Sequence, residues 1–263
     1  MTTMASNTEV SRGVWVFAEQ RGGIIKGTAY ELLTKGREIA DALQTELSAV
    51  CFGYKVVDTS RLVAAGADKV YLIDAPALKD NNEDLLTGEL IRLVRQHKPE
   101  IILAGATSLG RSFIPRVAAS LRTGLSADGT GLDIDVEKRQ LLQTKPAFGG
   151  NIMAVIICPE KHPQMATVRP RVFKAGTLDN VRKGTIIRVD FHKESVTSRT
   201  KLLEFVEDIT EKVKLEDADI IIAGGRGLGK AENFRMIEEL AKAMGAAVGA
   251  TRPPVDEGWT TYA

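Results

Sequence analysis

Residues 13–18, Gly-Val-Trp-Val-Phe-Ala, decide the class of fold. A short run of apolar residues without polar alternation is typical of a strand that is buried on both faces of a parallel sheet. From about Thr28 to Leu47, apolar side chains then recur at helical spacing. A buried strand followed by a helix begins a β-α-β unit, so we expect an α/β fold.

The alternation of strands and helices continues along the next part of the chain. We expect further strands at 47–52, 69–73 and 100–105, and further helices at 60–65, 84–96 and 111–121. This order predicts a doubly wound, mostly parallel sheet, with a ligand crevice at the carboxyl ends of its strands. Residues 105–111 could hold an anion there, but we interpret them as a helix start capped by Thr107 or Ser108.

From Leu132 the pattern changes to short apolar runs that Gly, Pro or charged turns divide. We interpret these runs as a β-rich appendage to the first sheet; they are 132–136, 140–145, 152–158, 164–168 and 184–191. A second β-α-β unit begins near residue 209. We therefore expect an N-terminal α/β domain over 1–208 and, over 209–263, the first part of an incomplete Rossmann-like or flavodoxin-like domain.

Composition excludes several classes of protein. The chain has 35 Lys and Arg against 34 Asp and Glu, without the basic excess of a nucleic-acid binder. It has no apolar stretch of roughly 18 residues, and Met1–Arg12 is polar, so we expect a cytoplasmic protein without membrane insertion. Cys51 and Cys158 stand far apart in apolar surroundings, which favours two buried thiols over a disulfide or a metal site.

The second unit carries the clearest ligand signal. An expected strand at 217–223 runs into Gly224-Gly225-Arg226-Gly227-Leu228-Gly229, and a helix follows from about Ala231 to Met244. Glycines let the backbone approach a ligand, and a helix N-terminus offers free N–H groups to a phosphate. The glycine spacing does not fit the NAD fingerprint, and Lys230 lacks the Ser or Thr of a Walker motif. We expect a nucleotide-type ligand of another kind.

Thr251 and Arg252 follow the next expected strand, at 246–249, and so lie on the same sheet edge as the glycine turn. An arginine there can offer a fixed cation and a fork of donors to a ligand, although a plain salt bridge is the alternative. His97, His162 and His192 are isolated in the sequence. We therefore expect no acid–base or nucleophilic catalysis, and no catalytic residue is assigned.

Taken together, these segments resemble one family. The glycine turn, Glu232-Asn233-Phe234 and the segments from Ala246 to Pro253 and from Val255 to Trp259 are similar to the electron transfer flavoprotein alpha subunit. Residues 123–128, 146–152 and 165–170 also match that family's first domain in order. The resemblance covers nearly the whole chain. Family segments of the type Gln-Val-Gly-Gln-Thr-Gly are absent after Trp259, so we expect a truncated alpha subunit with weakened FAD retention by this chain alone.

The resemblance implies an αβ heterodimer with an electron transfer flavoprotein beta subunit, carrying FAD. By motif, Arg226 and Gly227 would contact FAD in the glycine turn, and Thr251 at the next strand end, where the family usually has Ser. Arg252 would lie beside the isoalloxazine ring. Its cation would stabilise a reduced, anionic flavin.

The activity implied is that of an electron carrier and not of a stand-alone enzyme. The donors would be acyl-CoA dehydrogenases of fatty acid β-oxidation, or NADH, and some relatives bifurcate electrons to ferredoxin and enoyl-CoA. The alternative, which the generic first α/β unit suggests, is an adenine-nucleotide-binding regulatory module without redox activity. Pull-down of a beta subunit of comparable size would distinguish the two.

Overall fold

The computed structural model describes residues 11–192, 198–204, 215 and 218–260. The chain forms two compact units, Met1–Leu202 and Leu203–Ala263, which we call the N-terminal and C-terminal units. Each is described by itself. The expected boundary between residues 208 and 209 lies outside the described residues and stays a prediction.

The N-terminal unit is built on a seven-stranded sheet in the order β12-β5-β4-β1-β6-β11-β7. Every neighbouring pair in this sheet runs parallel. Its strands are β1 (Val14–Phe17), β4 (Leu47–Gly53), β5 (Lys69–Asp74), β6 (Ile101–Gly105), β7 (Leu125–Gly129), β11 (Gln164–Val168) and β12 (Thr185–Arg188). The predicted α/β fold with a mostly parallel sheet is confirmed.

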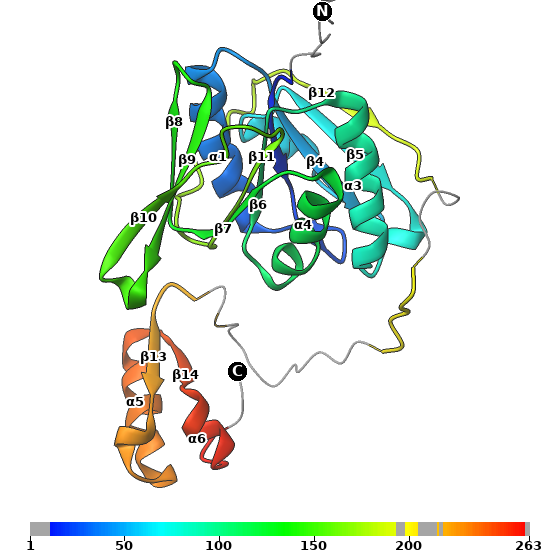
Figure 1. Ribbon diagram of the computed structural model, residues 1–263. Helices are drawn as coiled ribbons and strands as arrows, with labels where there is room; N and C mark the ends of the chain where they lie inside the picture. The colour runs from blue at the N-terminus through cyan, green and yellow to red at the C-terminus, as the bar shows by residue number, and fades with distance from the viewer. Residues whose placement is uncertain (1–10, 193–197, 205–214, 216–217, 261–263) are drawn as a thin grey trace, which may run out of the picture. The chain divides into compact units, whose positions relative to one another are not determined.

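Helices cover both faces of this sheet. In Figure 1, α3 (Glu83–His97) and α4 (Ser108–Leu121) lie side by side on one side of the strands, and α1 (Gly27–Ala42) lies on the other. The short helix α2 (Ser60–Ala64) packs into the same core as α1. Two covered faces need apolar residues in both alternating positions of a strand, which is why the central strands are continuous apolar runs.

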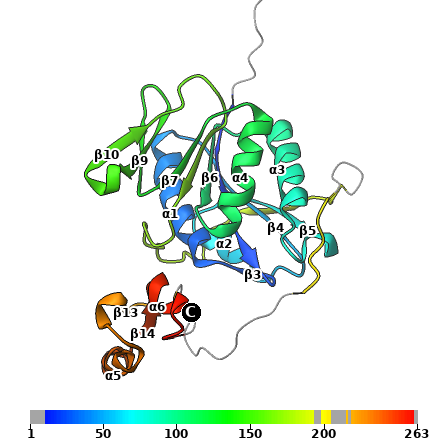
Figure 2. The same ribbon diagram turned by 60° about the horizontal axis from the view of Figure 1, so that its bottom comes forward.

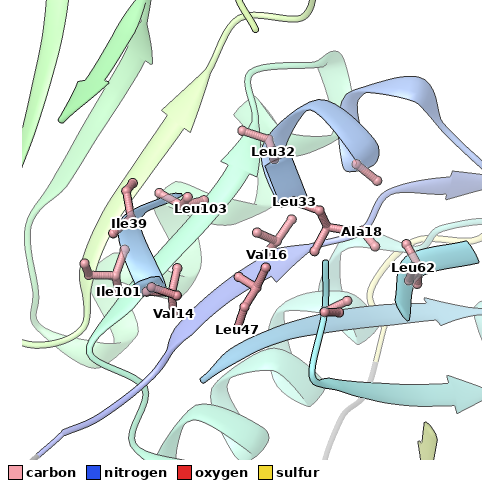
Figure 3. Packing of buried hydrophobic residues seen from close by; sticks show 14 of the residues in the cluster. Val14, Val16, Ala18, Leu32, Leu33, Ile39, Leu47, Leu62, Ile101 and Leu103 are labelled. Atoms are coloured by element: carbon pink, nitrogen blue, oxygen red, sulfur yellow. The ribbon is translucent and has the colours of Figure 1, made fainter. Parts of the chain in front are cut away.

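Strand β1 shows this division residue by residue. Val14 and Val16 pack with Leu33 and other residues of α1 in one buried cluster, which Figure 3 shows from close by. Trp15 and Phe17 point to the opposite face and pack in a second cluster with α3 and α4. The sequence 13–18 therefore supplies the centre of two cores at once.

Two helix boundaries differ from the expected ones. Helix α1 ends at Ala42 and not near Leu47, because the backbone leaves the helix at Gln44, whose φ is 51°. Helix α4 begins at Ser108 and not at Arg111. The side chain of Thr107 caps it, since its Oγ1 accepts a hydrogen bond of 3.0 Å from the Gly110 N–H. The capping interpretation of this segment is confirmed.

The β-rich appendage is only partly as expected. Three of the runs, β8 (Gly131–Asp135), β9 (Gln140–Ala147) and β10 (Ile152–Ile156), form a separate antiparallel sheet in the order β10-β9-β8. In Figure 2, β9 and β10 extend beyond the parallel sheet. The other two runs, β11 and β12, belong to the main sheet, so their assignment to an appendage was wrong. Strand β7 and the hairpin of β2 (Gln20–Arg21) and β3 (Ile24–Ile25) were not expected.

The C-terminal unit is a β-α-β element. Strand β13 (Ile221–Gly224) pairs in parallel with β14 (Ala247–Ala250), and α5 (Phe234–Met244) connects them. Helix α5 begins at Phe234 and not at Ala231, because a 3₁₀ turn, η5 (Ala231–Asn233), precedes it. A short helix, α6 (Arg252–Asp256), follows β14 where the sequence predicted only a strand end.

Both cysteines are free thiols, and only Cys51 is fully buried; Cys158 is half-buried, which corrects the expectation of two buried thiols. Burial, and after it the charge of Asp74, raises the pKa of the Cys51 thiol to about 12. Among the described residues, no helix combines the length and the hydrophobicity that crossing a membrane requires.

Candidate cofactor-binding site

The carboxyl ends of β13 and β14 bring the glycine turn and Thr251 together. Gly224 and Ala250 are paired at the ends of the two strands. Beyond them, the Thr251 N–H donates a hydrogen bond of 2.9 Å to the Gly224 carbonyl. A Cβ atom on Gly225 would stand 3.3 Å from Thr251 Oγ1. The two segments that the sequence placed on one edge are therefore in direct contact.

The turn itself is a compact 3₁₀ turn, η4 (Arg226–Leu228). The Leu228 N–H donates to the Gly225 carbonyl and the Gly229 N–H to the Arg226 carbonyl, at 3.0 Å each. Gly229 has a φ of 80°, a conformation that favours glycine. A Cβ atom on Gly227 would meet no atom within 4 Å, so the space beside the turn is open. Helix α5 does not begin at the turn, which corrects the expected strand-glycine-helix junction.

Two carboxylates of the α6 segment pair with the two arginines of the site. Arg252 is the first residue of α6, and its Nε donates to Asp256 Oδ2 at 3.2 Å. Arg226 Nε lies 3.7 Å from Glu257 Oε1. Both arginine side chains remain exposed, 73% for Arg226 and 86% for Arg252. The sequence analysis assigned neither acid to the site, although the i,i+4 spacing of Arg252 and Asp256 was a readable signal.

The chemistry of this donor set fits a ligand such as FAD. Arg226 belongs to the glycine turn and the Thr251 hydroxyl lies beside Gly225, while Arg252 follows Thr251 directly in the chain. Guanidinium groups are planar forks of donors that suit the phosphates of a dinucleotide. No group of three metal-ligating side chains occurs within the described ranges.

Comparison with known proteins decides the family. Residues 14–194 match the electron transfer flavoprotein domain family, and residues 214–263 match the electron transfer flavoprotein FAD-binding domain family. The chain belongs to the electron transfer flavoprotein alpha-subunit family. FAD is therefore the cofactor that this family implies for the site, and the FAD-binding match lies within the C-terminal unit.

Relatives from several bacteria share most of the chain. It is 46% identical over 251 residues to the electron transfer flavoprotein subunit alpha of Thermoanaerobacterium thermosaccharolyticum, covering 95% of this chain and 76% of the relative. It is 44% identical over 248 residues to the protein FixB of Clostridium saccharobutylicum, covering 94% and 74%. Against the alpha subunit of Megasphaera elsdenii the identity is 42% over 251 residues, covering 94% and 74%.

The strand ends of the N-terminal unit, where the sequence predicted a crevice, have a different chemistry. At the carboxyl ends of β1 and β6, the Thr107 hydroxyl donates a hydrogen bond of 2.5 Å to Glu19 Oε2. The same oxygen of Thr107 accepts the Gly110 N–H, so the start of α4 is capped by the chain itself. A carboxylate beside the start of the helix repels the negative charge of a phosphate and so disfavours phosphate binding there. Together with the family match, this does not favour the alternative of an adenine-nucleotide module without redox activity.

Proposed function

We propose that Arg226, Gly227, Thr251 and Arg252 hold FAD in this electron transfer flavoprotein alpha subunit. The observation that carries the proposal is the contact between the glycine turn and Thr251 at adjacent strand ends, inside the segment that matches the FAD-binding family. An open edge with two arginines beside it is the arrangement expected of a dinucleotide site on parallel strands.

Each residue has its own part in the proposal. Gly227 leaves the backbone of the turn open to the ligand, and Arg226 offers its guanidinium to the diphosphate. The Thr251 hydroxyl would donate a hydrogen bond to the ligand at the end of β14. Arg252 would lie beside the flavin ring, where its charge would favour the reduced, anionic form. FAD supplies the redox chemistry itself, which is the uptake of electrons from a donor and their release to an acceptor.

The assembly and the electron donors extend this proposal. Two of the relatives carry the name of an alpha subunit, which supports a second kind of subunit in the protein. We infer an αβ heterodimer with a beta subunit, located in the cytoplasm. It would accept electrons from acyl-CoA dehydrogenases of fatty acid β-oxidation or from NADH. Co-purification of the chain with a co-expressed beta subunit tests the heterodimer, and separate elution of the two chains would contradict it.

The substitution Arg252→Ala tests the site. We expect it to make the bound flavin harder to reduce, because a cation that favours the reduced form is lost. A charge interaction of about 1 kcal/mol corresponds to a fall of roughly 20 mV in the two-electron potential. A reduction titration against a reference dye measures this shift. Arg235→Ala on α5 is the control, since Arg235 is an equally exposed arginine with its own carboxylate partner, Glu239. Equal potentials for Arg252→Ala and the unaltered chain would contradict the role.

A further inference from the structure

Each of the two arginines of the candidate site has a carboxylate next to its Nε atom. Arg252 Nε donates to Asp256 Oδ2 at 3.2 Å, and Arg226 Nε lies 3.7 Å from Glu257 Oε1. We propose that Asp256 and Glu257 are positioning residues, which fix Arg252 and Arg226 by their inner nitrogen so that the outer edge of each guanidinium faces the ligand. This inference rests on the proposed function of the two arginines.

The guanidinium group can bind a carboxylate through one nitrogen and a ligand through the other two. It is a rigid plane with five N–H donors, of which only one belongs to Nε. A carboxylate at Nε therefore fixes the plane and leaves the four N–H donors of the outer nitrogens to other partners. A side chain that is already held when the ligand arrives loses less conformational freedom on binding. The expected gain is in affinity for the ligand.

The α6 segment is built to hold these carboxylates still. Pro253 and Pro254 fix the backbone immediately after Arg252, and Pro254 is buried. The segment is closed by three backbone hydrogen bonds, from Glu257 to Pro253, from Gly258 to Val255 and from Trp259 to Pro254. At its other end, the Thr251 N–H is bound to the end of β13. The two acids therefore belong to a short, hydrogen-bonded segment, and the residue before this segment is hydrogen-bonded to the end of β13.

The chain contains a matched pair outside the site. On α5, Arg235 Nε donates to Glu239 Oε1 at 2.9 Å, with the same i,i+4 spacing and the same donor atom as the pair of Arg252 and Asp256. Exposed pairs of this kind contribute little to stability. We therefore expect Asp256→Asn and Glu239→Gln to fold alike, and any difference in ligand binding to report on the site.

The experiment measures the affinity of the full 263-residue chain for FAD and for ADP, which carries the diphosphate without the flavin ring. We expect Asp256→Asn to weaken FAD binding about threefold to tenfold, to leave ADP binding unchanged and to leave the unfolding temperature unchanged. Asp256→Glu should restore the FAD affinity, since it keeps a carboxylate within reach of Nε. In an Arg252→Ala background, Asp256→Asn should add no further loss.

Glu257→Gln should weaken the binding of both FAD and ADP, with no further loss in an Arg226→Ala background. Glu239→Gln is the control and should change neither affinity. If Arg252→Ala and Arg226→Ala weaken FAD binding but the substitutions of their acids leave it unchanged, or tighten it, the positioning role is overturned and the proposed function stands. If neither arginine substitution affects FAD binding, the proposed function falls and the positioning role falls with it.

Discussion

Gly224 and Gly227 belong to one turn, but different neighbours restrict them. A Cβ atom on Gly224 would lie 2.7 Å from both Leu228 Cδ1 and Phe234 Cζ, and Phe234 is only 3% exposed. A Cβ atom on Gly227 would meet nothing within 4 Å. Packing inside the C-terminal unit therefore requires glycine at 224, whereas only a ligand would require it at 227.

This difference between two neighbouring glycines is testable. We expect Gly224→Ala to destabilise the C-terminal unit by about 1–3 kcal/mol, since a buried aromatic ring must move to admit the methyl group. Gly227→Ala should change the free energy of unfolding by no more than about 0.5 kcal/mol, while it weakens FAD binding. Urea unfolding followed by the fluorescence of Trp259, together with FAD titration, measures both quantities. Equal losses of stability in the two variants would contradict this account.

At the scale of elements, the sequence placed in the main sheet those strands whose residues are mostly apolar, which are β1, β4, β5 and β6. It misplaced β11 because Gln164 and Thr167 look like exposed polar positions, although both are buried. Their polar groups find partners far along the chain. The Gln164 amide donates to the Arg139 carbonyl, and the Thr167 hydroxyl accepts the Asp128 N–H. A local pattern does not contain such partners, so it cannot separate a satisfied buried strand from an exposed one.

The candidate site was likewise predictable from the sequence only in part. The contact of the glycine turn with Thr251 was predictable, because parallel strands joined by one helix end at the same edge. The pairing of Arg226 with Glu257 was not, because it requires the chain to reverse through α6 after Thr251. The sequence was interpreted there as a strand end, although Pro253 next to Arg252 is typical of a first helical turn.

One ion pair connects several elements of the N-terminal unit. Arg139, in the turn between β8 and β9, donates to both carboxylate oxygens of Glu100 at 2.8 and 2.6 Å, and to the Leu43 carbonyl at 3.1 Å. Glu100 is buried beside the start of β6. Its carboxylate therefore depends on Arg139 for compensation of its charge.

Removal of the Arg139 side chain should destabilise the N-terminal unit. We expect Arg139→Ala to lower the free energy of unfolding by about 2–3 kcal/mol, below the usual range for a buried pair because the arginine is 42% exposed. Lys138→Ala is the control in the same turn, since Lys138 is mainly exposed and lies 3.7 Å from its partner Asp135. It should cost no more than about 0.5 kcal/mol. Chemical denaturation of the three proteins measures these values, and a similar midpoint for both variants would contradict the role of the pair.

At the scale of the whole molecule, the two units carry one tryptophan each, Trp15 and Trp259. Trp15 is buried in the core on the side of α3, with its ring centroid 5.8 Å from that of His97. Trp259 is half-buried after α6. Each tryptophan therefore reports on its own unit, and Trp259→Phe leaves Trp15 as a reporter of the N-terminal unit alone.

Several groups of the N-terminal unit have a lowered pKa and make its stability depend on pH, and His97 and Asp68 are two of them. Burial, and after it the charges of Lys69 and Arg92, lowers the pKa of His97. Burial by itself would raise the pKa of Asp68, but the hydrogen bond from the Leu47 N–H and the contacts with Arg37 and Arg182 outweigh it and lower the pKa. The folded unit therefore binds protons less readily than the unfolded chain at both groups.

The expected profile follows from these signs. As the pH falls below about 6.5, the ordinary value for histidine, the unfolded chain takes up a proton that folded His97 resists, so stability decreases. A second decrease begins near pH 4, the ordinary range of aspartate, as Asp68 is protonated in the unfolded chain and then loses its contacts with Arg37 and Arg182. Urea unfolding of Trp259→Phe across this pH range measures both steps. His97→Gln should remove the upper step and keep the lower one, whereas Asp68→Asn should lower stability at neutral pH and reduce the lower step. An upper step that persists in His97→Gln would assign it to another group.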